Sequence, residues 1–359
     1  MELNTKDFDV LLEAAVNFKA TDIHLTSGSP PAFRINSELV VLKNCPVILP
    51  EDTRKIAESL LCGGKFCTLE RDGEIDFSFS KPGLGRFRVN IYRQRGTYSV
   101  AIRSLPFIIP AFEQLGLPQT VKSFARKTKG LVLATGPTGS GKSTTLASLL
   151  NVINHERRCH IITIEDPIEY LHRHSNSLVD QREIGADTRS FAAALRAALR
   201  EDPDVILVGE MRDPETISIA LTAAETGHLV FSTLHTVGAA KTIDRIIDAF
   251  EPSQQNQVKS QLATVLEGVV SQQLVPKKDG TGIVLACEVM VVNPAIRNLI
   301  REGKPYQINS VIQTGTNLGM QTLEGCLAQL VNDGVVSFDD ALVRALDAQY
   351  FFQLANKRW

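Results

Sequence analysis

The fold of this chain follows from one segment, Leu131-Val132-Leu133-Ala134-Thr135-Gly136-Pro137-Thr138-Gly139-Ser140-Gly141-Lys142-Ser143-Thr144. Its first five residues are an apolar run typical of a buried strand, and a helical pattern begins at Lys142. The residues from Gly136 to Ser143 fit G-x-x-x-x-G-K-[ST], in which glycines let backbone N–H groups wrap phosphates at a helix N-terminus. A glycine-rich turn that binds nothing is the alternative, and the strand–loop–helix context argues against it.

This loop predicts ATP and Mg²⁺ as cofactors. Residues Gly136 to Thr144 are expected to hold the nucleotide, with Lys142 reaching the β- and γ-phosphates and Ser143 supplying a ligand to Mg²⁺.

Two further apolar strands end in a carboxylate, Ile161 to Glu165 and Val205 to Glu210. Both acids are expected at the carboxyl edge of a parallel sheet, where ligands of open α/β sheets bind. One acid would polarise the attacking water, and the other would help to hold Mg²⁺ through water. Gly209 stands where many P-loop proteins place an Asp ligand to Mg²⁺, so either a water or Glu165 would take that role. A loop-capping carboxylate is the alternative for each acid alone.

His228 and His235 bracket the next strand, Leu229 to Ser232. We expect both near the same sheet edge or its flank, where an imidazole would sense a phosphate or contact a catalytic acid. A satisfied structural histidine is the equal alternative from the local pattern.

Strands and helices alternate through the middle of the chain, which predicts an α/β fold with a mainly parallel sheet covered by helices on both faces. Asp213 and Pro214 predict the start of a helix that ends near Glu225. The last third is expected to be mainly helical, with Val258, Leu262, Leu266, Val269 and Val270 in one apolar stripe. Two closing helices are expected on either side of Asn332, Asp333 and Gly334.

A composition break at residues 105–120, with Pro106, Pro110 and Pro118, predicts a connector between domains. We therefore divide the chain into an α+β domain at 1–104, the connector, an ATPase core at 121–290 and a helical portion at 291–359. In the first domain a helix is expected over Phe8 to Ala20, followed by short strands at residues 22–26, 32–35, 39–42, 75–80, 87–92 and 98–103.

The composition argues against several classes of protein. The formal net charge is −2 and the pI about 6.4, so no global basic field favours nucleic acid or an anionic membrane. The polar start and the absence of a long apolar run predict a cytoplasmic protein without membrane insertion. The six cysteines show no zinc-binding spacing.

Five arginines crowd two adjacent strands of the first domain: Arg86, Arg88, Arg93, Arg95 and Arg103. They could form a solvated basic face, a nucleic-acid patch with little aromatic interleaving, or arginine fingers that reach a nucleotide in another subunit. The third interpretation requires an oligomer.

The chain resembles the secretion and pilus ATPases of the RecA-like class, and within them the twitching-motility (PilT-type) retraction ATPases. The resemblance covers residues 7 to about 348. It rests on the P-loop and on five further segments: Asp22–Leu25 with Gly28–Pro31, Ile164–Glu169, Leu207–Asp213, Thr226–His235 and Ala295–Glu302.

This resemblance implies a RecA-like core behind a PAS-like N-terminal domain, and it makes Gly209 normal for the family. It implies Glu210 as the main catalytic acid, Glu165 as its partner, and His235 and His228 as phosphate-sensing or structural. It further implies a homohexamer with Arg88 and Arg103 as the first choices for fingers, docking on an inner-membrane pilus platform protein.

Residues Ala295–Glu302 resemble the C-terminal signature of the retraction branch. The chain also lacks the N-terminal extension and four-cysteine zinc element of assembly and type II secretion ATPases. We therefore expect a motor that retracts type IV pili, with a paralogous accessory retraction ATPase as a possible partner or identity. Pilus assembly or type II secretion is the first alternative, and a RecA-like DNA-dependent motor is a remote one.

Overall fold

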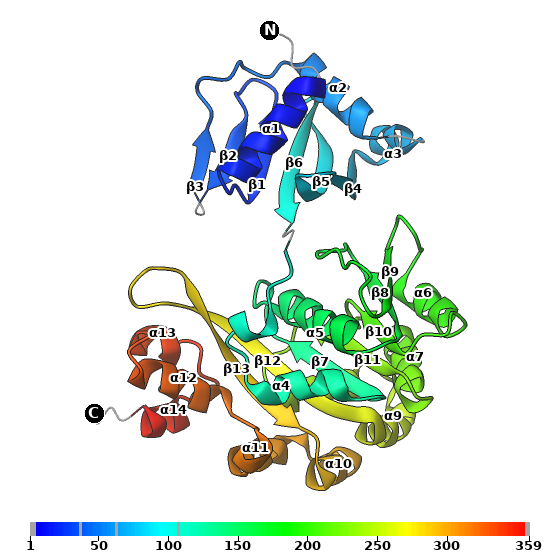
Figure 1. Ribbon diagram of the computed structural model, residues 1–359, viewed down its shortest axis with the longest axis vertical. Helices are drawn as coiled ribbons and strands as arrows, with labels where there is room; N and C mark the ends of the chain where they lie inside the picture. Colours follow the sequence, from blue (N-terminus) through cyan, green and yellow to red (C-terminus); the bar gives the residue numbers. More distant parts are fainter. Residues whose placement is uncertain (1–4, 36–37, 62–63, 106–107, 356–359) are drawn as a thin grey trace. The chain divides into compact units, whose positions relative to one another are not determined.

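The computed structural model describes residues 5–35, 38–61, 64–105 and 108–355 of this chain. Pro106, one of the three prolines of the expected connector, lies outside the described residues. The chain divides into two compact units (Figure 1). The first comprises Met1–Ile108 with Glu169–Leu171, and the second comprises Ile109–Ile168 with His172–Trp359.

The first unit is an antiparallel sheet with strand order β3-β2-β1-β6-β5-β4. Its strands are β1 (Asp22–Thr26), β2 (Ala32–Ile35), β3 (Glu38–Val41), β4 (Glu74–Lys81), β5 (Gly85–Gln94) and β6 (Thr97–Leu105). Alternate residues of β5, Phe87, Val89 and Ile91, are buried, as a sheet with one covered face requires.

Three helices accompany this sheet: α1 (Thr5–Asn17), α2 (Pro50–Leu60) and α3 (Lys65–Asp72). The predicted strands and α1 are present, with ends shifted by up to three residues. The sequence analysis missed α2 and α3, which are short and bury few side chains; α3 buries only Leu69 among its described residues. Short helices with so narrow an apolar stripe give little periodic signal.

The second unit contains a sheet with strand order β13-β12-β7-β11-β10-β8-β9. All neighbours are parallel except β12 and β13. The strands are β7 (Gly130–Thr135), β8 (His160–Glu165), β9 (Leu178–Glu183), β10 (Val205–Val208), β11 (Leu229–Leu234), β12 (Leu266–Pro276) and β13 (Ile283–Val291). The predicted α/β fold with a mainly parallel sheet is confirmed.

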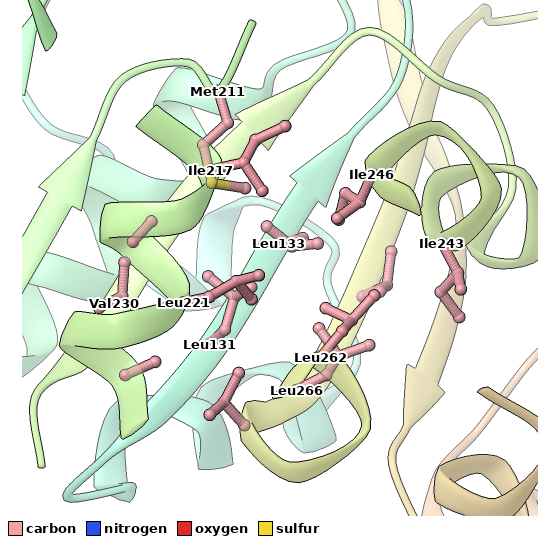
Figure 2. Close-up of a cluster of buried hydrophobic side chains, with 14 of the residues drawn as sticks. Leu131, Leu133, Met211, Ile217, Leu221, Val230, Ile243, Ile246, Leu262 and Leu266 are labelled. Carbon is pink, nitrogen blue, oxygen red and sulfur yellow. The ribbon is translucent and has the colours of Figure 1, made fainter. Parts of the chain in front are cut away.

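Helices cover both faces of this sheet. One face carries α7 (Pro214–Glu225), α8 (Ala239–Asp248) and α9 (Pro252–Val265), and the other carries α4 (Gln119–Ser123) and α5 (Lys142–Glu156). Along β7, Leu131 and Leu133 point to the first face, and Figure 2 shows them beside Leu221 of α7 and Leu262 of α9. A fully buried central strand explains why Leu131 to Thr135 forms a continuous apolar run.

The predicted helical stripe from Val258 to Val270 is wrong. Helix α9 ends at Val265, and Leu266 begins β12, which pairs in parallel with β7 and antiparallel with β13. Figure 1 shows this hairpin in yellow. The spacing of Val258 and Leu262 is helical, but Val269 and Val270 are adjacent and both buried because β12 has covered faces on both sides.

The chain closes with helices α10 (Pro294–Arg301), α11 (Ile308–Thr314), α12 (Leu323–Asn332), α13 (Phe338–Leu342) and α14 (Ala348–Leu354). Where two closing helices were predicted, the structure has α12, α13 and α14. The prediction of α7 is confirmed at both ends. The helix starts at Pro214, where Asp213 accepts a hydrogen bond from the Thr216 N–H, and it ends at Glu225. Helix α6 (Phe191–Ala198) precedes β10.

Candidate nucleotide site

The glycine-rich loop joins the end of β7 to the start of α5. Gly141 precedes the helix in the left-handed conformation, with φ of +89°, so no side chain caps the first N–H groups of α5. Lys142 is 8% exposed, and its Nζ donates to the carbonyl oxygens of Gly136 and Pro137, each at 2.9 Å. The lysine therefore spans the loop that it follows.

Gly136 holds this loop against β12. A Cβ at this position would lie 2.2 Å from the carbonyl oxygen of Gln272, and φ is +138°. Only glycine permits so close an approach of two backbones. Gln272 also donates from Nε2 to Oγ1 of Thr145 in α5, at 2.8 Å. Strand β12 therefore supports both the loop and the helix.

The loop residues fit a phosphate group. The Ser140 hydroxyl is buried, and no hydrogen-bond partner reaches it among the described residues. A Cβ at Gly139 or Gly141 would meet nothing within 4 Å, which leaves open space beside the loop. The start of a 15-residue helix carries the positive end of the helix dipole and favours an anion. Ser143, the residue that the sequence analysis expects to ligate Mg²⁺, lies in the first turn of α5.

The register of the sheet brings the other candidate groups to the same edge. Thr135 of β7 pairs with Leu234 of β11, and Val208 of β10 pairs with Ile164 of β8. Parallel strands end together. Gly136, His235 and Gly209 therefore follow the ends of β7, β11 and β10 at the same edge where Glu165 ends the neighbouring strand β8 (Figure 1).

The side chain of Glu210 is largely enclosed at this edge, with 17% of it exposed. Its Oε2 lies 2.7 Å from Nη2 of Arg212, and its Oε1 lies 3.3 Å from Nε2 of His235. Burial by itself raises the pKa of Glu210, but Arg212 and then His235 outweigh burial and hold this pKa below its usual value. Glu210 is therefore a carboxylate at neutral pH, as a general base must be.

Glu165 is oriented by two hydrogen bonds. Its Oε1 accepts from Oγ1 of Thr163 at 2.7 Å and from Nε2 of Gln181 on β9 at 3.1 Å.

Gly209 lies against the end of β8. A Cβ on Gly209 would stand 3.1 Å from the Ile164 carbonyl oxygen and 3.3 Å from the Glu165 Cα. The Gly209 N–H donates to that same Ile164 oxygen at 2.8 Å, and the Gly209 carbonyl accepts from Oγ1 of Thr233 at 2.6 Å. The absence of a side chain at 209 thus lets β10 and β8 end in close contact, directly before their acids.

The two histidines lie at opposite edges of the sheet, so the expectation that they share an edge is wrong. His235 follows β11 and contacts Glu210. His228 precedes β11, and its carbonyl accepts from the N–H of Gly130, the first residue of β7. Its Nδ1 lies 2.9 Å from the Ala223 carbonyl at the end of α7. The six residues of β11 separate the two histidines by about 20 Å.

Arg88 and Arg103 pair directly across β5 and β6 in the first unit. Arg103 Nε lies 2.8 Å from Asp22, and Arg88 Nε lies 3.5 Å from Asp76. Both arginine side chains are exposed, at 44% for Arg88 and 64% for Arg103. Like charges directly opposite each other on a sheet repel, and the two aspartates offset that repulsion. The pair therefore presents two guanidinium groups from one rigid face.

These features define an ATPase with a P-loop and a RecA-like sheet. A model of the family described as "Type II/IV secretion system protein" matches residues 72–341, and the chain belongs to this family.

Within the family, this chain is similar to pilus retraction motors. It is 48% identical over 339 residues to the type IV pilus retraction ATPase PilT of Pseudomonas aeruginosa, covering 94% of this chain and 98% of the relative. It is 46% identical over 337 residues to a twitching motility protein of Neisseria gonorrhoeae, covering 92% and 90%. A crystal structure of the pilus retraction motor PilT with bound ADP has a TM-score of 0.91 and 51% identity, covering 97% and 98%. The expected resemblance to PilT-type ATPases is confirmed.

Several side chains that orient the acids were given no role by the sequence analysis. Arg212, Thr163, Gln181 and Gln272 contact Glu210, Glu165 or the P-loop region. Arg212 lies in the segment Leu207–Asp213 that carried the resemblance. Its position two residues after Glu210 could have predicted their ion pair. Gln181 and Gln272 lie on β9 and β12, strands that the sequence analysis did not predict, so their proximity had no local signature.

Within the described ranges, no helix combines the length and apolar character needed to span a bilayer.

Proposed function

We propose that this chain is an ATP-hydrolysing motor that powers type IV pilus retraction and hence twitching motility, acting as a homohexamer at the cytoplasmic, inner-membrane base of the pilus machine. The observation that carries the hydrolytic part is Glu210, ionised and fixed at the sheet edge that also bears the P-loop. The retraction part is supported by the 48% identity to a retraction ATPase over nearly the whole of both chains.

In this proposal, residues Gly136 to Thr144 cradle the phosphates, Lys142 exchanges its loop carbonyls for phosphate oxygens, and Ser143 ligates Mg²⁺. The bound Mg²⁺ would supply neutralisation of negative charge on the phosphates. Backbone N–H groups at the start of α5 add to that neutralisation because the helix dipole is positive there.

Glu210 accepts the proton of the attacking water, and His235 senses a phosphate through the same hydrogen-bonded group. Glu165, held by Thr163 and Gln181, is its partner and a candidate for water-mediated contact with the metal ion. His228 has a structural role in this proposal, joining the end of α7 to the start of β7.

Arg88 and Arg103 would act in trans, from the N-terminal domain of one subunit on the nucleotide of the next. Nucleotide binding and release would change the angle between the two domains, and the ring would pass this motion to an inner-membrane platform protein. A paralogous accessory ATPase is a candidate partner of the ring. Nucleic acid has no role in this mechanism.

The test compares surface pili and surface motility in a strain deleted for this gene and in one carrying Glu210→Gln. We expect abundant pili with lost motility in both strains. The purified variant should lose about 10²- to 10⁴-fold in ATP turnover, because a general base is removed while the shape of the side chain is kept. Bald cells would move the assignment to pilus assembly, and unchanged pili and motility would indicate an accessory role or another machine.

A further inference from the structure

A cavity of about 490 Å³ lies in the second unit between the start of α8, β13 and the C-terminal helices. Its lining includes Lys241 of α8, Glu288 of β13, Glu324 of α12, and Leu346, Asp347 and Tyr350 around the start of α14. Its volume is within the range of small-molecule sites. None of these residues belongs to the sheet edge assigned to the nucleotide.

Two carboxylates are buried in the wall of this cavity. Glu288 is 4% exposed and Glu324 is 5% exposed. Glu288 Oε1 accepts from the Ala239 N–H at 2.7 Å, and Glu324 Oε1 accepts from the N–H groups of Leu346 and Asp347 at 2.9 and 3.0 Å. In the part of the chain that the structure describes, no donor meets Oε2 of either acid.

One oxygen of each carboxylate, Oε2, is therefore left open beside the cavity. A carboxylate oxygen without a protein donor normally accepts hydrogen bonds from water or from another group in the space that it faces. Burial, opposed by the Ala239 N–H and aided by the nearby charge of Glu324, raises the pKa of Glu288 to about 7. The open Oε2 atoms and the raised pKa of Glu288 both indicate that a positively charged group would be stabilised in this cavity.

The remaining lining defines the chemistry of that group. Glu288, Glu324 and Asp347 carry negative charge against the single Lys241. Asp347 already accepts from the Tyr350 N–H at 2.9 Å, so the two glutamates have the free acceptors. Leu346 and Tyr350 add an aliphatic and an aromatic surface, which suit an alkyl chain next to a cationic head.

We propose that this cavity binds a small organic ammonium cation, of the aliphatic diamine class, with its ammonium group on the carboxylates of Glu288 and Glu324. An ammonium carries three donors and no acceptor, which matches two open carboxylate oxygens. The alkyl chain would lie along Leu346 and Tyr350.

The site is connected to the hydrolytic edge through α8. Glu288 caps this helix at Ala239, and Gly238 donates its N–H to Oγ of Ser271 at 2.8 Å. Only Thr236, Val237 and Gly238 separate α8 from His235. A bound cation would keep Glu288 ionised and its cap on α8 strong, so the cavity would be a regulatory site for the loop that carries His235.

The experiment is a calorimetric titration of the full chain with 1,4-diaminobutane, at constant ionic strength set with potassium chloride. We expect one saturable site whose affinity falls as the pH falls below about 7, because the free Glu288 carboxyl then takes up a proton while Lys241 stays charged. Glu288→Gln keeps an acceptor for Ala239 and should weaken binding about 10- to 100-fold, the value of a charge-assisted hydrogen bond.

Lys241→Met provides a test that does not disturb the buried acids, because Lys241 is exposed. Loss of a like charge should tighten binding about two- to fivefold. Lys278→Met, an exposed lysine of the β12–β13 turn outside the cavity lining, is the matched control and should leave affinity unchanged. The proposal fails if no saturable binding is seen, if Glu288→Gln retains full affinity, or if Lys241→Met and Lys278→Met behave alike.

Discussion

Arg212 determines the ionisation of the acid that we assign as general base. Its guanidinium lies 2.7 Å from Glu210, whereas His235 is at 3.3 Å and its charge depends on protonation. Arginine stays charged at all accessible pH values, so its effect on Glu210 does not change during a pH titration. Glu210 is thereby kept ionised although its side chain is only 17% exposed.

Arg212→Met should raise the pKa of Glu210, because burial then acts with less opposition. A general base works when ionised, so activity on the acid side should be lost at a higher pH than in the parent chain. The pH profile of kcat measures this shift. Arg196→Met breaks an arginine–carboxylate pair with Glu215 that does not include Glu210, and it should leave the profile in place. An unmoved acid limb in Arg212→Met would contradict the assignment of Glu210.

At the scale of elements, the ends of β8 and β10 determine where the two acids stand. Gly209→Ala should lower kcat by up to about 10²-fold while the protein stays folded, because the added Cβ would press on Ile164 and Glu165 and displace the acid by a few tenths of an ångström or more. Gly325→Ala in α12 places a Cβ 3.1 Å from Oγ1 of Thr322, an equal crowding far from the acids. Equal turnover in the two variants would argue against a positioning role for Gly209.

The elements also show what the sequence could and could not predict. The P-loop, the strands before Glu165 and Glu210, and α7 followed from local pattern, since apolar runs, caps and glycines act over a few residues. Strand β12 did not, because Val269 and Val270 are buried by partners far away in the chain. His228 was misplaced for a related reason. The local pattern shows a histidine at each end of β11, but only the carboxyl end of that strand lies near the P-loop.

At the scale of the whole molecule, the assignment of Arg103 as a finger predicts activity shared between subunits. Arg103→Ala and Lys142→Ala should each be nearly inactive as purified rings. Rings co-expressed from both variants should regain turnover at roughly a quarter of their interfaces by random assortment, because one subunit then supplies the arginine and its neighbour the P-loop.

Lys142→Ala co-expressed with Glu210→Gln is the matched control for this experiment. Both residues lie at one sheet edge of a single subunit, so mixing should restore little beyond the background of either variant. Equal recovery in the two mixtures would remove Arg103 from the catalytic site.

Strand β12 connects the P-loop to the C-terminal part of the second unit. Its Gln272 backbone touches the P-loop at Gly136, while the next residue, Gln273, donates to the Arg344 carbonyl, and Arg344 donates in return to Leu274. We therefore expect a shift of the P-loop to reach the segment between α13 and α14 through β12. Hydrogen exchange with and without ADP tests this connection. The backbone amides around Arg344 should change their protection together with those of β12.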